Sequence, residues 1–280
     1  MTTTLRPAEP LQQTPEGGRS RTYDVCVNSR RVGSVRLGTD PGFGAAAGVI
    51  ADLRIAEPDR RRGRGTVAAL ASEEVLRGWG CTEVLISVPA EAEAARRMAR
   101  ALGYTERSRN MLKELPPGEP PELPAGVEVR AMTGAEFEAW SARAKEGFAR
   151  SWIERGVPEE QARAKAEESH RRHLPQGLAT PGTAVHVAVR DGRDVGLLWT
   201  GRMERTPGER LGFVYEVEVA EEQRGRGYGR ALMLLAERVA REAGETRLGL
   251  HVFAGNTPAL RLYDSLGYRT THVNSAKTLL

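Results

Sequence analysis

The sequence contains one long segment twice. Residues 51–115 align with residues 215–279 without a gap, and about a third of the aligned residues are identical. A gap-free repeat of this length indicates a duplicated structural unit. With 280 residues, the chain is long enough for two ordinary domains, each with a core of its own. The sequence therefore predicts two tandem copies of one fold.

Each copy contains the pattern Arg-x-x-Gly-x-Gly, at residues 60–65 and at residues 224–229. In the second copy an alternating apolar run at 213–219 precedes it, and a helical run at 230–236 follows it. A strand, a glycine-rich turn and a helix can hold an anionic group, because glycines allow close backbone approach and the first helical N–H groups lack internal partners. No Lys-Ser/Thr follows the last glycine, which excludes a Walker loop. The pattern predicts a diphosphate site, and an ordinary tight turn is the alternative.

Local composition divides the chain further. Residues 1–21 are polar and contain several prolines, which predicts a disordered leader without the apolar segment of a signal peptide. Residues 22–115 form the first predicted domain, and residues 126–280 form the second. Between them, residues 116–125 are rich in proline, which predicts a semi-rigid linker.

Composition argues against several classes of protein. The two cysteines, Cys26 and Cys81, lie far apart, and neither they nor the five histidines show metal-ligand spacing, so we expect no metal site. The net charge is only +4 with acids and bases interleaved, which does not favour nucleic acid as a partner. No apolar run approaches the length of a membrane span, so we expect no membrane association and a cytoplasmic location.

Three features of the second copy occur together: the loop at 224–229, Asn256 after the next strand, and the ending Tyr263-x-x-x-Gly267-Tyr268. In this combination residues 213–280 resemble the GNAT superfamily of acyl-CoA-dependent N-acetyltransferases, and the tandem architecture resembles that of mycothiol synthase. The resemblance implies an α/β (α+β) fold. Each of the two GNAT domains is expected to be a mixed, mainly antiparallel sheet that is splayed near the loop and flanked by helices.

The resemblance also implies a bacterial acyltransferase whose cosubstrate is acyl-CoA, and acetyl-CoA first of all. The acceptor is expected to be the primary amine of a small molecule, which attacks the thioester directly. The residues expected to contact the cofactor lie on the strand before the loop, in the loop and after the next strand: Val217, Val219, Arg224, Gly225, Arg226, Gly227, Tyr228, Gly229, Arg230 and Asn256. Asn256 is equally suited to cap the helix that follows it.

The resemblance assigns the proton-transfer roles to four residues. Tyr263 is expected to protonate the leaving thiolate, since a positioned phenol can donate a proton. Glu216 and Glu218 project from one face of their strand and can deprotonate the amine, directly or through water. His251 on the next strand is the third candidate base. A packed aromatic ring, a solvated strand face and a core histidine are the respective alternatives.

The first copy lacks these groups. In the places of Glu216, Glu218, His251, Asn256 and Tyr263 it carries Asp52, Arg54, Ser87, Ala92 and Ala99. It also lacks counterparts of two helical patterns of the second copy, at 136–155 and 158–173, which in GNAT enzymes cover the acceptor groove. We therefore expect a degenerate, non-catalytic first domain. Whether its loop, with Arg60, Gly63 and Gly65, still binds CoA stays open.

Two other functions are compatible with the same residues. One is a CoA-binding sensor or scaffold without turnover, against which the complete set of acid and base groups in the second copy argues. The other is acetylation of a protein N-terminus or lysine, which requires a groove wide enough for a peptide.

Overall fold

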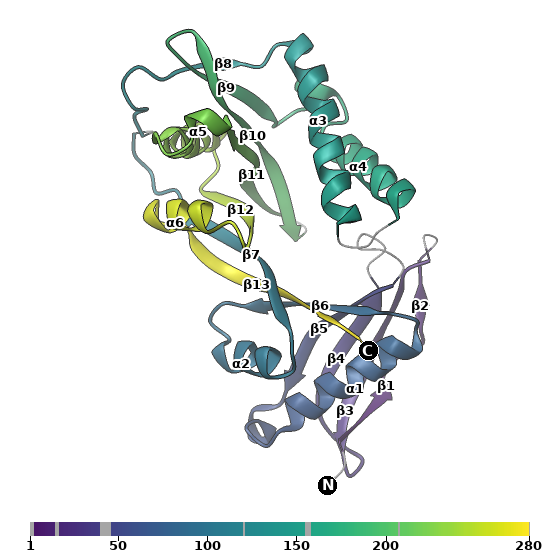
Figure 1. Cartoon of the computed structure of the whole chain (residues 1–280). Helices are drawn as coiled ribbons and strands as arrows, with labels where there is room; N and C mark the ends of the chain where they lie inside the picture. The colour runs from purple at the N-terminus through teal and green to yellow at the C-terminus, as the bar shows by residue number, and fades with distance from the viewer. Residues whose placement is uncertain are drawn as a thin grey trace. The chain divides into compact units, whose positions relative to one another are not determined.

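The computed structural model describes residues 3–14, 17–39, 46–119, 121–154, 158–206 and 208–279. The chain forms two compact units, which we describe separately. The first unit comprises Met1–Ser108 and His272–Leu280, and the second comprises Arg109–Thr271. Figure 1 shows the elements of both units with their labels.

The first unit is built on a sheet with one parallel strand pair, β5–β6; its other neighbouring strands are antiparallel. Helices α1 (Arg64–Gly78) and α2 (Glu93–Ala101) and the short helix η2 (Glu57–Asp59) complete it. In spatial order the strands are β1 (Thr3–Pro7), β3 (Arg19–Val27), β4 (Arg30–Thr39), β5 (Ala47–Ile55), β6 (Glu83–Pro89) and β13 (Arg269–Thr278), and β2 (Gln12–Gln13) pairs with β3.

The second unit repeats this plan: β11 pairs with β12 in parallel, and the pairs β10–β11, β9–β10 and β8–β9 are antiparallel. Its strands, in spatial order, are β7 (Thr105–Glu114), β12 (Arg247–Phe253), β11 (Glu209–Val219), β10 (Arg193–Thr206), β9 (Ala184–Arg190) and β8 (Glu128–Ala131). Its helices are α3 (Gly134–Ile153), α4 (Glu159–His173), α5 (Tyr228–Glu242) and α6 (Thr257–Ser265), with the short helices η3 (Gly177–Ala179) and η4 (Glu221–Gln223). The predicted mixed, mainly antiparallel sheets flanked by helices are confirmed.

Strand alternation gives the sheet of the second unit two apolar faces. On β10, Leu198 packs in a core with Leu232 of α5, whereas its neighbours Leu197 and Trp199 pack in another core with Trp140 of α3. Because successive side chains of a strand point to opposite faces, α5 lies on one face and α3 with α4 on the other (Figure 1).

Both sheets are splayed at their parallel pair. In the second unit the pairing of β11 with β12 ends at Val214 and Leu250, although β11 continues to Val219. In the first unit the pairing of β5 with β6 ends at Ile50 and Ile86. These pairs occupy equivalent positions in the two copies, so the duplication preserves the splay.

The leader is ordered where the structure describes it, which corrects the prediction of disorder for residues 1–21. Thr3–Pro7 forms β1 and pairs with β3, and Leu5 packs against the core of the first unit. Its polar composition concealed a strand that lies at the sheet edge, where one side remains in water. Residues 1, 2, 15 and 16 lie outside the described residues.

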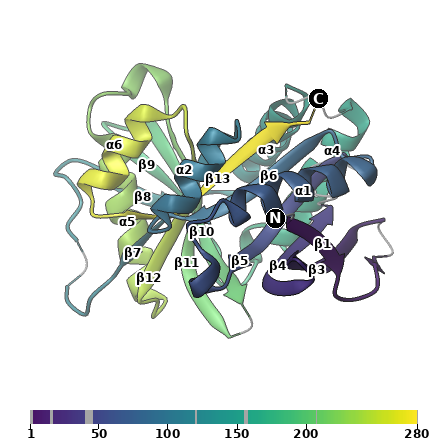
Figure 2. The same cartoon turned by 90° about the horizontal axis from the view of Figure 1, so that it is seen from below.

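The last strand of each copy belongs to the sheet of the other copy. Strand β13 closes the second copy in sequence but pairs with β6 of the first unit, as Figures 1 and 2 show. Strand β7 closes the first copy but neighbours β12 of the second unit. The predicted domain boundaries, 22–115 and 126–280, therefore differ from those of the compact units, because each unit includes a strand from the other copy. The two strands have similar sequences because the copies are similar. Sequence comparison therefore cannot tell which of the two sheets each strand joins.

A buried lysine–glutamate pair fixes each exchanged strand. Lys113 of β7 donates to Glu237 of α5 at 2.6 Å and lies 5.8 Å from the ring centroid of Tyr268. In the first unit Lys277 of β13 donates to Glu73 of α1 at 2.6 Å, with Tyr104 at 5.7 Å. Both glutamate side chains are 4 % exposed. The two clusters consist of residues at equivalent positions of the two copies, so both exchanged strands are held by the same kind of contact.

The segment between the copies packs against the second unit. Among its described residues, 116–119 and 121–125 form no helix or strand. Leu123 contacts the core of the second unit, and Arg238 of α5 donates to the carbonyl oxygen of Pro121 at 2.9 Å. Pro120 of the predicted linker lies outside the described residues.

We predict that Lys113→Met lowers the free energy of unfolding by about 2–4 kcal/mol, because it leaves the buried Glu237 carboxylate without its partner. Lys277→Met is expected to act alike through Glu73. Urea unfolding of the full chain measures both. The control is Lys145→Met, whose partner Glu167 is 67 % exposed and whose cost is expected to stay below about 1 kcal/mol. Equal effects of Lys113→Met and Lys145→Met would contradict the role of the buried pair.

Candidate functional site

The loop after β11 has the backbone geometry of an anion cradle. Gly225 and Gly227 adopt positive φ angles of +77° and +88°, a region that side-chain-bearing residues rarely occupy. Gly227 is the N-cap of α5, so the first N–H groups of the helix are directed out of its N-terminus. Arg224 donates from Nε to the carbonyl oxygen of Val219 at 3.4 Å, which ties the loop back to its strand.

Helix α6 supports this loop from behind. A Cβ atom at Gly229 would lie 3.2 Å from Leu262 of α6, so glycine permits the close approach of the two helices. Arg230 donates to the hydroxyl of Ser265 at 2.6 Å. Tyr228 is buried in the core, whereas Arg224, Arg226 and Arg230 are exposed. The loop therefore presents three guanidinium groups above a rigid helix start.

A β-bulge in β11 brings two consecutive side chains to the same face of the sheet. Trp199 of β10 pairs with Glu216 and Thr200 pairs with Val214, so Tyr215 is the extra residue. The Tyr215 ring stacks on Trp199 at 4.7 Å and lies 4.9 Å from His173 of α4. The alternating pattern at 213–219 did not indicate the bulge, since an unbroken alternation would place Tyr215 and Glu216 on opposite faces.

Glu216 lies below α3. Trp140 donates from its indole Nε1 to the Glu216 carboxylate at 3.1 Å. Burial, and then the neighbouring Glu218 carboxylate, raise the pKa of Glu216, while the Trp140 hydrogen bond and Arg143 act in the opposite direction. A carboxyl group with a raised pKa exchanges its proton closer to neutral pH than a solvated one.

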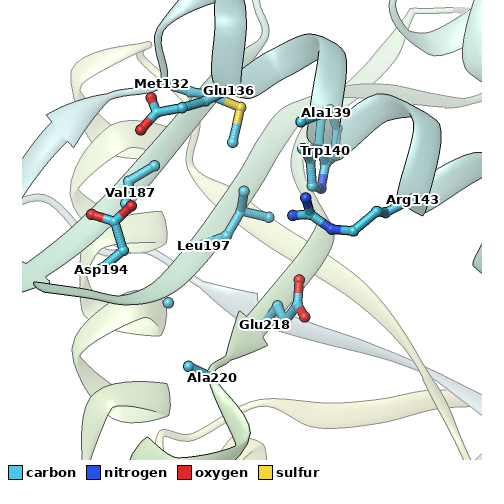
Figure 3. Close-up of a pocket in the computed structure, with 11 residues that line it drawn as sticks. Met132, Glu136, Ala139, Trp140, Arg143, Val187, Asp194, Leu197, Glu218 and Ala220 are labelled. Carbon is cyan, nitrogen blue, oxygen red and sulfur yellow. The ribbon is translucent and has the colours of Figure 1, made fainter.

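Glu218 lines a cavity of about 320 Å³ between α3 and the sheet (Figure 3). Residues of α3 at helical spacing form one wall, and the ends of β10 and β11 form the floor. The lining consists of Met132, Glu136, Ala139, Trp140, Arg143, Val187, Asp194, Gly196, Leu197, Glu218 and Ala220. Ala220 precedes η4 and the glycine loop, so the cavity lies beside the loop along the chain.

The structure does not bring His251 into this cavity. His251 is exposed on β12, beyond the point at which β11 and β12 separate. Its ring contacts the exposed Phe253 edge-on, with centroids 5.4 Å apart. Glu216 and Glu218 therefore share the surroundings of α3, and His251 lies on a different strand.

Tyr263 and Asn256 occupy the two ends of α6. Tyr263 is buried, 5.9 Å from Tyr268, and burial raises the pKa of its phenol, so it holds its proton at neutral pH. Asn256 caps the helix, and its side chain accepts a hydrogen bond from the backbone N–H of Ala259 at 3.2 Å. The capping alternative for Asn256 is confirmed, and it leaves the second carbonyl lone pair and the amide N–H groups for other partners.

The first unit has the same loop geometry, but different side chains pack beneath its loop. Gly63 has a φ of +73° and caps α1, and Arg60 donates to the Ile55 carbonyl oxygen at 2.8 Å, as Arg224 does to Val219. Where the second unit has Tyr228, the first has Arg64, which is buried against Asp59. Asp59 also binds Arg30 at 2.7 Å. An ion-pair network thus occupies the base of this loop.

Sequence reasoning missed the contribution of α3. The helical pattern at 136–155 assigned no role to Trp140 or Arg143. The spacing of Glu136, Ala139, Trp140 and Arg143 is that of one helix face, and this signal was available. The residues that face α3 across the cavity could not be identified from the sequence, because they belong to strands far along the chain.

Among the described residues no helix is long and apolar enough to span a membrane, and no group of three or more His, Cys, Asp and Glu side chains could hold a metal ion.

Comparison with known proteins identifies relatives over most of the chain. The model of the acetyltransferase (GNAT) family matches residues 4–104 and 143–268. A mycothiol acetyltransferase of Acidothermus cellulolyticus is 33% identical over 238 residues, which cover 78% of this chain and 68% of the relative. The uncharacterized N-acetyltransferase YdgE of Bacillus subtilis is 35% identical over 151 residues, 53% of this chain and 95% of YdgE.

A solved structure shares the fold. The GCN5-related N-acetyltransferase from Sphaerobacter thermophilus superposes with a TM-score of 0.59 at 21% identity, and the match covers 92% of this chain and 80% of that one.

We predict that Glu216→Gln stabilises the protein at pH 8 by on the order of 1 kcal/mol, because burial disfavours the charged carboxylate. Since the folded-state pKa is raised, the protonated carboxyl contributes its stability fully below the unfolded-state pKa of about 4.3. The contribution is lost as the pH rises through the folded-state pKa. Urea unfolding from pH 4 to pH 8 should therefore show the wild type falling below the variant. The control is Glu218→Gln at an exposed position, and an equal pH trend there would contradict the assignment.

Proposed function

Because this chain belongs to the GNAT family of acetyltransferases, we propose that its second unit transfers an acetyl group from acetyl-CoA to the primary amine of a small molecule. GNAT enzymes use acyl-CoA as cosubstrate. The observation that carries the proposal is the position of an acid-lined cavity beside a glycine loop of the anion-binding type. The mycothiol acetyltransferase relative supports acetyl as the acyl group and a small molecule as the acceptor.

The residues of the loop fit the diphosphate of CoA. Gly225 and Gly227 expose the backbone, and three exposed arginines surround the start of α5: Arg224, Arg226 and Arg230. We assign the pantetheine arm to the gap between β11 and β12. There the edge of β11 beyond Val214 is not paired with β12, which leaves the backbone near Val217 and Val219 available to the cofactor.

We assign the proton transfers to groups on either side of this gap. Glu216 is the preferred base, because its raised pKa suits proton abstraction near neutral pH, and Glu218 attracts the ammonium form of the acceptor. Tyr263 is the acid, since its phenol remains protonated at neutral pH and can donate that proton to the CoA thiolate that is released when the thioester breaks. Glu216 accepts a hydrogen bond from Trp140 of α3 and Glu218 lines the cavity, whereas His251 lies on β12 and contacts Phe253, so His251 ranks behind the glutamates.

The first unit is assigned a non-catalytic role. Of the proposed acids and bases it keeps only one carboxylate, Asp52 in the place of Glu216, which lies 3.5 Å from both Arg36 and Arg54. Among the described residues no helix precedes its central strands. Ser87, in the place of His251, hydrogen-bonds to Asn274 of the exchanged strand at 2.7 Å. The Ser87 side chain therefore contributes to the packing of the sheet.

We predict that Gly227→Glu weakens acetyl-CoA binding at least 100-fold, because the new carboxylate repels the diphosphate. Calorimetric titration of the full chain should give one site in the wild type and none in the variant. Gly63→Glu is the matched control, because Gly63 has the same backbone role in the first unit. Gly227→Ala separates strain at positive φ from charge repulsion. Two wild-type sites would show that the first unit also binds CoA. A wild type that does not bind at all would refute the enzyme.

We predict that Tyr263→Phe lowers kcat by about 100-fold or more while the affinity for acetyl-CoA changes little, since only proton donation is removed. Steady-state release of CoA measures the rate, and calorimetry measures the affinity. Tyr268→Phe is the control: its buried hydroxyl has no hydrogen-bond partner among the described residues, so its removal should leave kcat unchanged. An unchanged kcat in Tyr263→Phe would exclude the phenol as the acid.

A further inference from the structure

The cavity below α3 carries two kinds of charged group. Glu136 and Asp194 both bind Arg130, Glu136 at 2.6 and 2.8 Å and Asp194 at 3.0 and 3.1 Å. The Arg130 guanidinium, with hydrogen bonds from Thr133, lowers the pKa of Glu136 to about 2. Both carboxylates are therefore paired with Arg130, and the three side chains hold the start of α3 against β10.

Arg143 and Glu218 form the second kind. Both line the cavity, both are exposed, and neither forms a hydrogen bond or an ion pair with the described residues. Figure 3 shows the guanidinium of Arg143 and the carboxylate of Glu218 directed into the same space from opposite walls. One cavity thus presents a positive and a negative group that are both still available.

We propose that the acceptor carries an anionic group, a carboxylate or a phosphate, close to its reactive amine, and that Arg143 selects it by binding that group. The inference rests on the proposed function of the second unit. The planar guanidinium binds two oxygens of a carboxylate or phosphate in parallel, which an ammonium group cannot do. With the anion held at α3, the ammonium end of the acceptor reaches Glu218 and Glu216, next to the cofactor gap.

The position of Arg143 on its helix supports selection by geometry. Arg143 lies one helical turn beyond Trp140, whose indole is fixed by Glu216, and two turns beyond Glu136, which Arg130 anchors. The backbone that carries Arg143 is thus held at both preceding turns. An acceptor that lacks the anionic group forms no ion pair with the Arg143 guanidinium and is therefore bound less tightly.

The test compares matched acceptors in steady-state acetylation by the full chain. One pair is L-phenylalanine and L-phenylalaninamide, and the other is glucosamine 6-phosphate and glucosamine. The two pairs distinguish a carboxylate from a phosphate. The variants are Arg143→Met, which removes the charge, and Arg143→Lys, which keeps the charge without the planar fork. Arg150→Met, at an exposed position further along α3 that does not line the cavity, is the control.

We expect the anionic member of at least one pair to be preferred in kcat/KM by about tenfold or more. Arg143→Met should abolish that preference through KM, Arg143→Lys should restore it in part, and Arg150→Met should keep it. Because the ratio within a pair is compared between variants, the different basicities of the two amines cancel.

Two results would overturn the inference in distinguishable ways. If the neutral amines are acetylated with the same kcat/KM as the anionic ones, or if Arg143→Met keeps the preference, selection by Arg143 is wrong. The proposed acetyltransferase activity is then unaffected. If acetyl-CoA binds but no amine of either pair is acetylated, the small-amine acceptor assigned under the proposed function fails, and the inference fails with it.

Discussion

The structure depends on the exchange of one strand between the two copies. Each sheet is completed by a strand from the other copy, and each exchanged strand brings a lysine to a glutamate that is buried in a helix of the receiving unit. A buried carboxylate is costly without a partner, so the pairing of Lys113 with Glu237 makes the unit that carries the candidate site dependent on the first copy. This dependence offers a physical reason for the presence of a copy that lacks most of the groups to which we assign proton transfer.

Within the second unit, two departures from regular structure create the site. The separation of β11 from β12 beyond Val214 opens a gap, and the bulge at Tyr215 turns Tyr215 and Glu216 together toward α3 and α4. The glycine loop follows at the end of the same strand. One strand therefore brings together an unpaired edge, two carboxylates and the glycine loop, and α3 covers the cavity beside Glu218. Among the described residues, the first unit retains the splay and the loop but has no helices in the place of α3 and α4, and Asp52 is its one carboxylate in the place of the two glutamates.

Much of the fold followed from the chain itself. The gap-free repeat predicted two similar sheets, and the glycine pattern predicted the turn that starts α5, because positive φ at Gly225 and Gly227 is a local property. The alternation at 213–219 predicted the strand with Glu216 and Glu218. Local patterns could not reveal the ordered β1, whose strand is stabilised by pairing with β3, nor the bulge that rotates Glu216.

By itself, the sequence determined the elements, the family resemblance and the residue types available for chemistry, because these depend on neighbours along the chain. Tertiary structure alone decided which sheet each last strand joins, since β7 and β13 carry the same pairing pattern and either sheet could accept either of them. It also decided that Arg143 and Glu218 share a cavity while His251 lies apart from it. Side chains that are distant in sequence acquire a common environment only when helices and strands pack, and their charges, burial and hydrogen bonds follow from that packing.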